Sequence, residues 1–297
     1  MRLLPALPPP RERLPLLIDS DVANEIDDLY AIGLALAAPH RFDLKGFVAT
    51  HFSGKAGPES TGKSYDLLLR FLQASGHDKQ LAASRGGHPM QYPETPVPSA
   101  GTELIIDRAL RATEANPLWI VVLGAATNTA SALLLAPEIM PRVRVVFHAR
   151  CSRLWPERTA QFNVFGDVIA AQTLLSCGVP LVWFDTGTGL AVAYEETRRR
   201  LAPIGATGRF LHDYRDLEHG FADSQKGFYD LGDIAWMIDP TLCAVSTVPA
   251  PTLERTLEFN HNHTHGFMLR TTGIDVERTW ELFFRTLEQA WKAGVIA

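Results

Sequence analysis

The residues best suited to chemistry are carboxylates crowded into one short stretch near the N-terminus. Like charges so close together repel one another, and a cation held between them removes that repulsion. Carboxylate oxygens are the ligands that hard divalent cations prefer, with Ca²⁺ taking about 6 to 8 and Mg²⁺ fewer with more water. The plainer alternative is a solvated acidic turn, in which carboxylates favour the start of a helix. The five carboxylates are Asp19, Asp21, Glu25, Asp27 and Asp28.

The flanking sequence places these carboxylates between a strand and a helix. Residues 14–18 form an apolar run of strand length, and residues 29–37 have the composition of a buried helix. Ligands of parallel α/β sheets bind outside the carboxyl ends of the strands, which is where this Asp-x-Asp pair lies. That position favours a metal site over a solvated turn.

The rest of the chain alternates strand and helix patterns. Apolar runs such as residues 118–123 are continuous, as in buried parallel strands. The alternation predicts an α/β fold with a mostly parallel central sheet, helices on both faces and a small antiparallel addition near the C-terminus. Further strands are expected at 43–50, 80–83, 143–148 and 179–184, helices at 61–75, 102–113, 127–135, 167–176, 195–201, 207–217, 231–238 and 277–292, antiparallel strands at 241–248, 252–259 and 267–272, and loops at 51–60 and 84–100.

Composition narrows the classes of function. No linker or charge run divides the 297 residues, so we expect one domain over residues 13–297 behind a proline-rich extension, residues 1–12. A net charge of −5 offers no basic footprint for nucleic acid. No run of about 18 apolar residues indicates a membrane span, and the first residues are too proline-broken for a signal peptide. We therefore expect a cytoplasmic protein with a small-molecule substrate and three ordinary, buried cysteines.

The acidic stretch resembles the N-terminal signature of the nucleoside hydrolases, the inosine-uridine-preferring family. That signature reads Asp-x-Asp-Pro-Gly-x-Asp-Asp and precedes an apolar helix. Here five residues, Val22 to Ile26, separate the two Asp pairs where the usual motif has three, and Pro-Gly is missing. The resemblance implies a Rossmann-like nucleoside hydrolase fold in a divergent subfamily.

Three later segments resemble the same family, in the family's order. Each carries one substitution at a position where the family motif is usually fixed. Read alone, Thr127, Asp167 and Asp230 could equally be helix caps. The segments are residues 124–130, which resemble Gly-x-Leu-Thr-Asn-x-Ala with Ala126 for Leu; residues 161–167, which resemble Glu-Phe-Asn-x-x-x-Asp with Gln161 for Glu; and residues 228–240, which resemble His-Asp-Pro-Leu-Ala-x-Ala with Tyr229 for His.

The resemblance implies calcium-dependent hydrolysis of the N-glycosidic bond of a ribonucleoside or related N-riboside, giving free base and ribose. It implies that Asp21, Asp28 and Asp230 bind Ca²⁺ together with the main-chain carbonyl of Thr127. Asp21 would also be the general base on a metal-bound water. Family members are often dimers or tetramers, so a homodimer or homotetramer is expected by analogy.

The same resemblance implies a set of substrate-binding residues. Asp27, Gln161 and Asn163 would bind ribose hydroxyls, and Trp155 stands where another ribose-binding Asn is usual. Tyr229 occupies the position of the acid that protonates the leaving base. A tyrosine with an unperturbed pKa near 10 protonates a base poorly at neutral pH, so His51 is a second candidate for that role.

Other interpretations stay open. Residues 18–22 also resemble the first motif of haloacid dehalogenase-type, Mg²⁺-dependent phosphatases, in which the first Asp is a nucleophile. A non-catalytic calcium-binding or ligand-binding member of the nucleoside hydrolase fold is a third. His261, His263 and His265 alternate, so they would share one face of a strand as a transition-metal cluster or as an exposed hairpin end. The hairpin end is favoured because no carboxylate or Cys accompanies them at fixed spacing.

Overall fold

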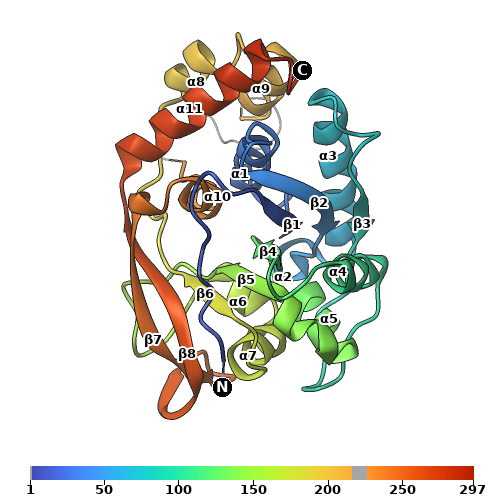
Figure 1. Ribbon diagram of the computed structural model, residues 1–297, viewed down its shortest axis with the longest axis vertical. Coiled ribbons are helices and arrows are strands. Elements are labelled where there is room, and N and C mark those ends of the chain that lie inside the picture. Colours follow the sequence, from blue (N-terminus) through green and yellow to red (C-terminus); the bar gives the residue numbers. More distant parts are fainter. Residues whose placement is uncertain (1, 216–225) are drawn as a thin grey trace.

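A central sheet between two layers of helices forms the described part of the chain, residues 2–215 and 226–297 of a computed structural model (Figure 1). The strands are β1 Leu14–Ser20, β2 Phe42–Ala49, β3 Ala83–Arg85, β4 Leu118–Val122, β5 Val143–His148, β6 Leu181–Phe184, β7 Cys243–Leu253 and β8 Phe259–Ile274. Their order across the sheet is β3-β2-β1-β4-β5-β6-β8-β7. All neighbours pair in parallel except β7 and β8, so the predicted fold class is confirmed.

The C-terminal addition differs from the expectation in detail. Two long strands stand where three shorter ones were expected, because residues 252–259 contain the hairpin turn rather than a strand of their own. Leu257 adopts a positive φ of 69° in that turn, and the Glu254 N–H donates to the Glu258 carbonyl across it, at 2.8 Å. The expectation of a separate middle strand was therefore wrong, and β8 also joins the main sheet in parallel with β6.

The helices follow the expected order, with boundaries shifted by a few residues. The prediction missed two short helices, Ser53–Ala56 and Phe162–Gly166, which are too short to show helical periodicity in the sequence. The end of the helix expected at 207–217 lies outside the described residues. The helices are α1 Asp27–Leu36, α2 Ser53–Ala56, α3 Ser60–Ala74, α4 Ala100–Arg111, α5 Thr127–Leu135, α6 Phe162–Gly166, α7 Val168–Ser176, α8 Tyr194–Arg200, α9 Gly205–Asp213, α10 Leu231–Ile238 and α11 Val276–Lys292, with 3₁₀ turns at Pro137–Arg142 and Pro240–Leu242.

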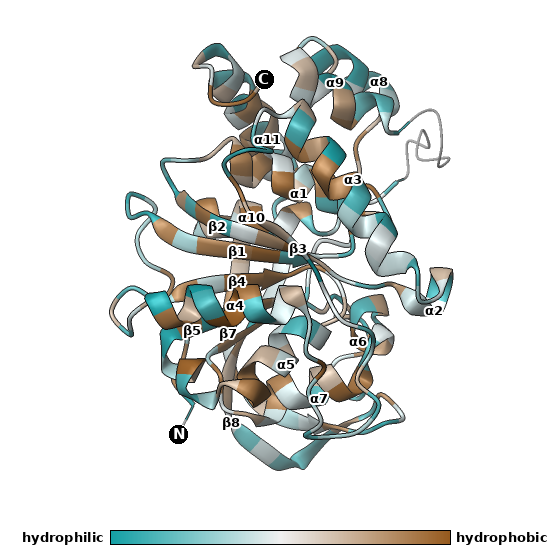
Figure 2. Cartoon of the chain, turned by 90° about the vertical axis from the view of Figure 1, so that its right-hand side faces the viewer, coloured by the Kyte–Doolittle hydropathy of each residue, from teal (hydrophilic) through white to brown (hydrophobic). Residues whose placement is uncertain are grey.

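Each face of the sheet has its own hydrophobic core. Helices α1, α3, α10 and α11 pack on one face, and α4, α5 and α7 pack on the other, as Figure 2 shows edge-on with the strands coloured hydrophobic. Strand β1 is buried along its whole length, as expected for a parallel strand covered on both sides. Two-sided burial holds the carboxyl end of β1, and the carboxylates that follow it, in a fixed place.

Arginines fasten the N-terminal segment to the domain. The Arg41 guanidinium donates to the carbonyls of Pro8, Pro9 and Glu12, and Arg2 donates to the carbonyls of Leu174 and Leu175. These bonds to main-chain carbonyls hold residues 2–12, which form neither a helix nor a strand. Within the described residues, none of the helices is both long enough and apolar enough to cross a membrane.

Candidate active site

A cavity of about 130 Å³ opens at the carboxyl ends of β1, β4 and β5. We call it the acidic pocket, after the carboxylates that line it. It receives side chains from the turn before α1, from the segment around α6 and from the turn before α10, which are far apart in the sequence. Its principal polar residues are Asp21, Asp27, Asp28, His148, Arg150 and Asp230.

Asp21 directly follows β1, Asp28 lies in the first turn of α1, and both side chains are buried. The Ser20 hydroxyl donates to Asp28 Oδ1 at 2.5 Å, but Asp21 Oδ2 has no hydrogen-bond partner among the described residues. Burial, together with the charge of Asp27, raises the pKa of Asp28 to about 8. Burial and the charges of Asp28 and Asp27 raise the pKa of Asp21 well above its usual range. Both carboxylates are therefore costly to ionise unless a positive charge joins them.

Asp230 completes the cluster from the opposite side of the pocket, at the start of α10. Oxygens of Asp27, Asp28 and Asp230 lie within 4.8 Å of one another. Asp27 Oδ2 accepts hydrogen bonds from the main-chain N–H groups of Tyr229, at 3.0 Å, and Asp230, at 3.4 Å, which ties α10 to α1. Burial and the charges of Asp28 and Asp27 raise the pKa of Asp230 strongly. These oxygens, with the unpartnered Asp21 Oδ2, fit a hard divalent cation.

Asp19 supports the turn and does not line the pocket. Its Oδ1 accepts from Asn128 Nδ2 at 3.0 Å, and its Oδ2 accepts from Thr129 Oγ1 at 3.2 Å, so the carboxylate joins β1 to α5. The side chain is fully buried. A phosphatase nucleophile needs an accessible oxygen, so the haloacid dehalogenase interpretation is not supported by this geometry.

Gln161 and Asn163 both line the acidic pocket. Gln161 Oε1 accepts a hydrogen bond from the Val164 N–H at 3.0 Å and caps α6. The side-chain NH₂ group is then the part of Gln161 that can donate to a ligand. Asn163 Nδ2 donates to the carbonyls of Leu123, at 2.6 Å, and His148, at 3.2 Å, which leaves its amide oxygen as an acceptor. The pair thus offers a donor and an acceptor, a combination suited to hydroxyl groups.

Two residues expected at the site, Thr127 through its main-chain carbonyl and Trp155, are not among those that line the acidic pocket. Thr127 begins α5, and its hydroxyl bonds Asp167 Oδ2 at 2.6 Å and His51 Nε2 at 2.7 Å; Leu123, not Thr127, lines the acidic pocket. Trp155 packs against Phe259, with ring centroids 5.0 Å apart, and is not among the residues that line that pocket. Both residues follow strands, but the turn after each strand directs the side chain to a different neighbour.

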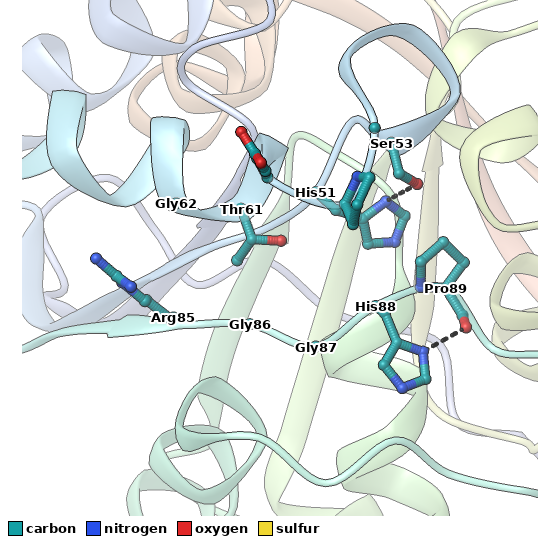
Figure 3. A pocket seen from close by; sticks show the side chains of 12 residues that line it. His51, Ser53, Thr61, Gly62, Arg85, Gly86, Gly87, His88 and Pro89 are labelled. Carbon is teal, nitrogen blue, oxygen red and sulfur yellow. Dashed lines mark hydrogen bonds between the residues drawn. The ribbon is translucent and has the colours of Figure 1, made fainter.

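His51 lies in a second and larger cavity of about 610 Å³ beside α2. We call it the histidine pocket; His51, Ser53, Thr61, Arg85 and His88 line it. Figure 3 shows His51 and Ser53 turned toward each other, with Ser53 Oγ 3.2 Å from His51 Nδ1. Burial, with a smaller contribution from the charge of His88, lowers the pKa of His51 to about 4. A histidine that is neutral at pH 7 is a poor acid for protonating a leaving base.

The sequence analysis missed His148, Asp233 and Arg150. His148 Nδ1 lies 2.7 Å from Asp233 Oδ2 and 3.5 Å from Asp230 Oδ1, so it joins β5 to α10 beside the carboxylate cluster. Two signals could have found the pair. His148 ends a strand at the edge where ligands bind, and Asp233 follows Asp230 by three residues, which puts both on one side of a helix.

The alternating histidines of β8 form an exposed surface, as favoured from their sequence. His261 Nε2 bonds the Pro156 carbonyl at 2.8 Å, and His265 Nε2 lies 3.1 Å from Thr252 Oγ1. They belong to neither of the two groups of side chains, among the described residues, that lie close enough together to hold a metal ion. The cysteines are free thiols, but the expectation that they are buried was wrong, because Cys151, Cys177 and Cys243 are each only partly buried.

Comparisons with known proteins point to one family. Residues 16–283 match the family model of the inosine-uridine preferring nucleoside hydrolases. The non-specific ribonucleoside hydrolases RihC of Shigella flexneri and Escherichia fergusonii are 28% and 29% identical over 252 residues, 77% of this chain and 81% of each relative. The fold is shared with a purine-preferring ribonucleoside hydrolase from Gardnerella vaginalis, with a TM-score of 0.74 and 20% identity over 94% of this chain and 99% of that one. A plant nucleoside hydrolase, PpNRh1, gives a TM-score of 0.72 and 18% identity over the same shares.

Proposed function

The chain belongs to the family of inosine-uridine preferring nucleoside hydrolases, and we propose that it is a calcium-dependent ribohydrolase whose reaction takes place in the acidic pocket. Membership makes it an N-glycosidase, which splits a ribonucleoside into free base and ribose. The observation that carries the location is the carboxylate cluster of Asp27, Asp28 and Asp230, beside the buried and unpartnered Asp21 Oδ2. Mutual repulsion in that cluster is relieved when a divalent cation binds.

Asp21, Asp28 and Asp230 are the proposed side-chain ligands of the ion. Oxygen donors favour Ca²⁺ or Mg²⁺ over softer metals, and flexible carboxylates from separate elements suit the larger Ca²⁺. Leu123 lines the pocket at the end of β4, so its main-chain carbonyl is a better candidate than that of Thr127 for the backbone ligand. His148 Nδ1 is engaged by Asp233 and is not counted as a ligand. When bound, the ion supplies positive charge that lowers the pKa of a water molecule.

The chain's own residues then bind the sugar and move the proton. Asp21 accepts the proton of the water that attacks the anomeric carbon, because its Oδ2 has no competing donor. Asp27, Gln161 and Asn163 present acceptors and donors to the ribose hydroxyls. Hydrogen bonds that strengthen as the ring flattens stabilise an oxocarbenium-like transition state. The electron pair of the broken C–N bond leaves with the base.

A reducing-sugar assay tests this proposal directly. Purine and pyrimidine nucleosides are incubated with the parent protein and with Asp21→Ala, with and without calcium. We expect calcium-dependent release of ribose that falls by about a thousandfold or more in the variant, as when a general base is removed. Asp66→Ala is the matched control, because Asp66 is exposed and pairs only with Arg85 among the described residues.

The alternative outcome is equally clear. If calcium binds to the parent protein with micromolar or better affinity but no nucleoside in the panel releases ribose, the ribohydrolase proposal fails. The pocket is then a binding site in a non-catalytic member of the fold.

A further inference from the structure

Arg150 differs from the other basic residues of the acidic pocket because its buried Nε has no hydrogen-bond partner among the described residues. Three basic side chains line the pocket: Lys55, His148 and Arg150. Lys55 Nζ donates to the main-chain and side-chain oxygens of Asn24, at 3.2 and 3.1 Å. His148 is bonded to Asp233. Arg150 Nε is buried and has no hydrogen-bond partner among the described residues.

Stacking, rather than ion pairing, positions the Arg150 side chain. Its guanidinium carbon lies 3.9 Å from the centre of the Tyr229 ring. A guanidinium stacked on an aromatic face keeps the N–H groups on its edge directed outward, where they can bind an anion in two-point fashion. A guanidinium that shares a pocket with several carboxylates usually forms a salt bridge with one of them. Because Arg150 forms none with the described residues, an anionic ligand could supply the charge-assisted hydrogen bonds that its N–H groups lack.

The proposed reaction creates negative charge at one place besides the water. When water attacks the anomeric carbon, its proton passes to Asp21 and the C–N bond breaks. The electron pair of that bond goes to the leaving nitrogen, so the base departs as an anion and takes a proton from solvent afterwards. The ribose ring carries positive and not negative charge in the oxocarbenium-like transition state, and ribose is released as a neutral sugar. Arg150, whose buried Nε has no partner among the described residues, therefore matches the leaving group and not the sugar.

We propose that Arg150, held on the Tyr229 ring, binds the departing base and stabilises it as an anion. This inference rests on the proposed ribohydrolase function and adds a residue and a substrate class to it. The preferred substrates are N-ribosides whose free base has an acidic ring N–H, so that the leaving nitrogen carries the charge easily, or whose base bears a carboxylate that the Arg150 guanidinium can bind. Tyr229 acts through Arg150 as a positioning residue, and no side chain has to protonate the base.

A series of aryl ribosides with graded leaving-group acidity tests the role of Arg150. Nitro-substituted phenyl β-ribofuranosides leave as phenolates, so kcat/KM can be measured against the acidity of each phenol with the calcium-loaded protein. In Arg150→Met we expect a loss of about a hundredfold for the least acidic phenol and only a few-fold for the most acidic, the size of effect seen when one charge-stabilising group is removed. If Arg150 has only a structural role, kcat/KM falls by the same factor for every substrate, and this result would overturn the proposal.

Matched variants separate Arg150 from its surroundings. Arg153→Met, an exposed residue of the same loop, should retain the parental dependence on phenol acidity. Tyr229→Leu removes the ring and should steepen the dependence of kcat/KM on phenol acidity, as Arg150→Met does. Tyr229→Phe keeps the ring, so its kcat/KM should depend on phenol acidity as that of the parent protein does. If Tyr229→Phe steepens the dependence as much as Arg150→Met, the phenol hydroxyl is the acid and the proposal is wrong.

A binding measurement distinguishes failure of this inference from failure of the proposed function. Calorimetry with the calcium-loaded protein compares orotate, a pyrimidine bearing a carboxylate, with uracil and with ribose 5-phosphate. We expect Arg150→Met to lower the affinity for orotate at least tenfold and to leave the affinity for uracil unchanged, whether or not turnover is seen. If Arg150→Met instead lowers the affinity for ribose 5-phosphate, Arg150 binds an anion attached to the sugar, and the assignment to the leaving group is overturned. Absence of turnover with every riboside, together with tight orotate binding, rejects only the ribohydrolase function.

Discussion

The acidic pocket and the histidine pocket lie on two sides of the short helix α2 and satisfy their polar groups in opposite ways. From Ser53 and His51, which line the histidine pocket, a continuous chain of hydrogen bonds runs to the buried Thr127 and Asp167 behind it. Asp167 also accepts from the Met90 N–H, at 2.8 Å, and from the Ala170 N–H, at 2.9 Å. In the acidic pocket, by contrast, three carboxylates crowd together and Asp21 Oδ2 has no partner among the described residues.

The difference shows which cavity needs a ligand. A polar network whose members are all paired is stable by itself, whereas buried like charges are tolerated only when something else compensates them. The larger cavity is therefore not the better candidate for the reaction centre. A destabilising arrangement of buried charges usually serves a function, because selection for stability alone would favour sequences without it.

The strongest test of this contrast is Asp28→Asn. Because the amide is neutral and a weaker ligand, we expect ribose release to fall by about a thousandfold or more. Relief of the repulsion with Asp27 and Asp230 should at the same time stabilise the calcium-free protein, by about 1 kcal/mol. Thermal unfolding in a chelator and the reducing-sugar assay measure the two effects. A variant that is both active and less stable would contradict the picture of a cluster held for function.

Calcium removal should act on the acidic pocket alone. Saturating calcium at about a hundred times its dissociation constant stabilises a protein by about 2.7 kcal/mol, which for a chain of this size raises the unfolding midpoint by several degrees. A chelator should therefore lower the midpoint of the parent protein and leave that of Asp28→Asn nearly unchanged. An equal response in both proteins would place the calcium site elsewhere.

Asp167→Asn is the corresponding test of the histidine pocket. The variant exchanges one acceptor oxygen for a donor, so it loses bonds to the Met90 N–H, the Thr127 hydroxyl or the Ala170 N–H, and we expect about 1–3 kcal/mol of destabilisation. Urea unfolding measures this loss, with the exposed Asp213→Asn as the control. The calcium-dependent shift of the midpoint should persist in Asp167→Asn. Loss of that shift would show that the two pockets are coupled and not independent.

The contrast also explains what the sequence could predict. Asp21, Asp27 and Asp28 follow one buried strand, and the family motifs carry Asp230 to the same edge of the sheet, so local patterns sufficed to bring these residues together. The direction of individual side chains was not predictable in this way. Thr127 starts a helix and faces Asp167, while Leu123, with no functional side chain to mark it, lines the pocket.

Trp155 and Arg150 show a second reason for error. Both belong to the irregular segment between β5 and α6, where no periodicity indicates which side chains are buried together. Trp155 packs against Phe259 of β8, and Arg150 packs on Tyr229 beside α10, contacts between segments far apart in the sequence. Motif spacing gives no information about such contacts, whereas the parallel sheet itself follows from the alternation of its elements.

The last prediction uses pH to measure how firmly the histidine pocket holds His51 in its neutral form. The folded protein lowers the pKa of His51 to about 4, below the ordinary value of 6.5, because burial and the nearby His88 disfavour its charged form. The stabilisation is complete above pH 6.5 and is lost as the pH falls from 6.5 toward 4, since the unfolded chain binds the proton first. Between pH 7 and pH 5.5 the loss amounts to about 1 kcal/mol.

Comparison with His51→Asn isolates this contribution from every other titrating group. The free energy of unfolding in urea, measured in a chelator at pH 7 and pH 5.5, should fall by about 1 kcal/mol more in the parent than in the variant. His263→Asn, at an exposed position of β8, should behave as the parent does. If parent and His51→Asn show the same change with pH, His51 accepts a proton readily in the folded state, and the histidine pocket is then less self-sufficient than its hydrogen bonds indicate.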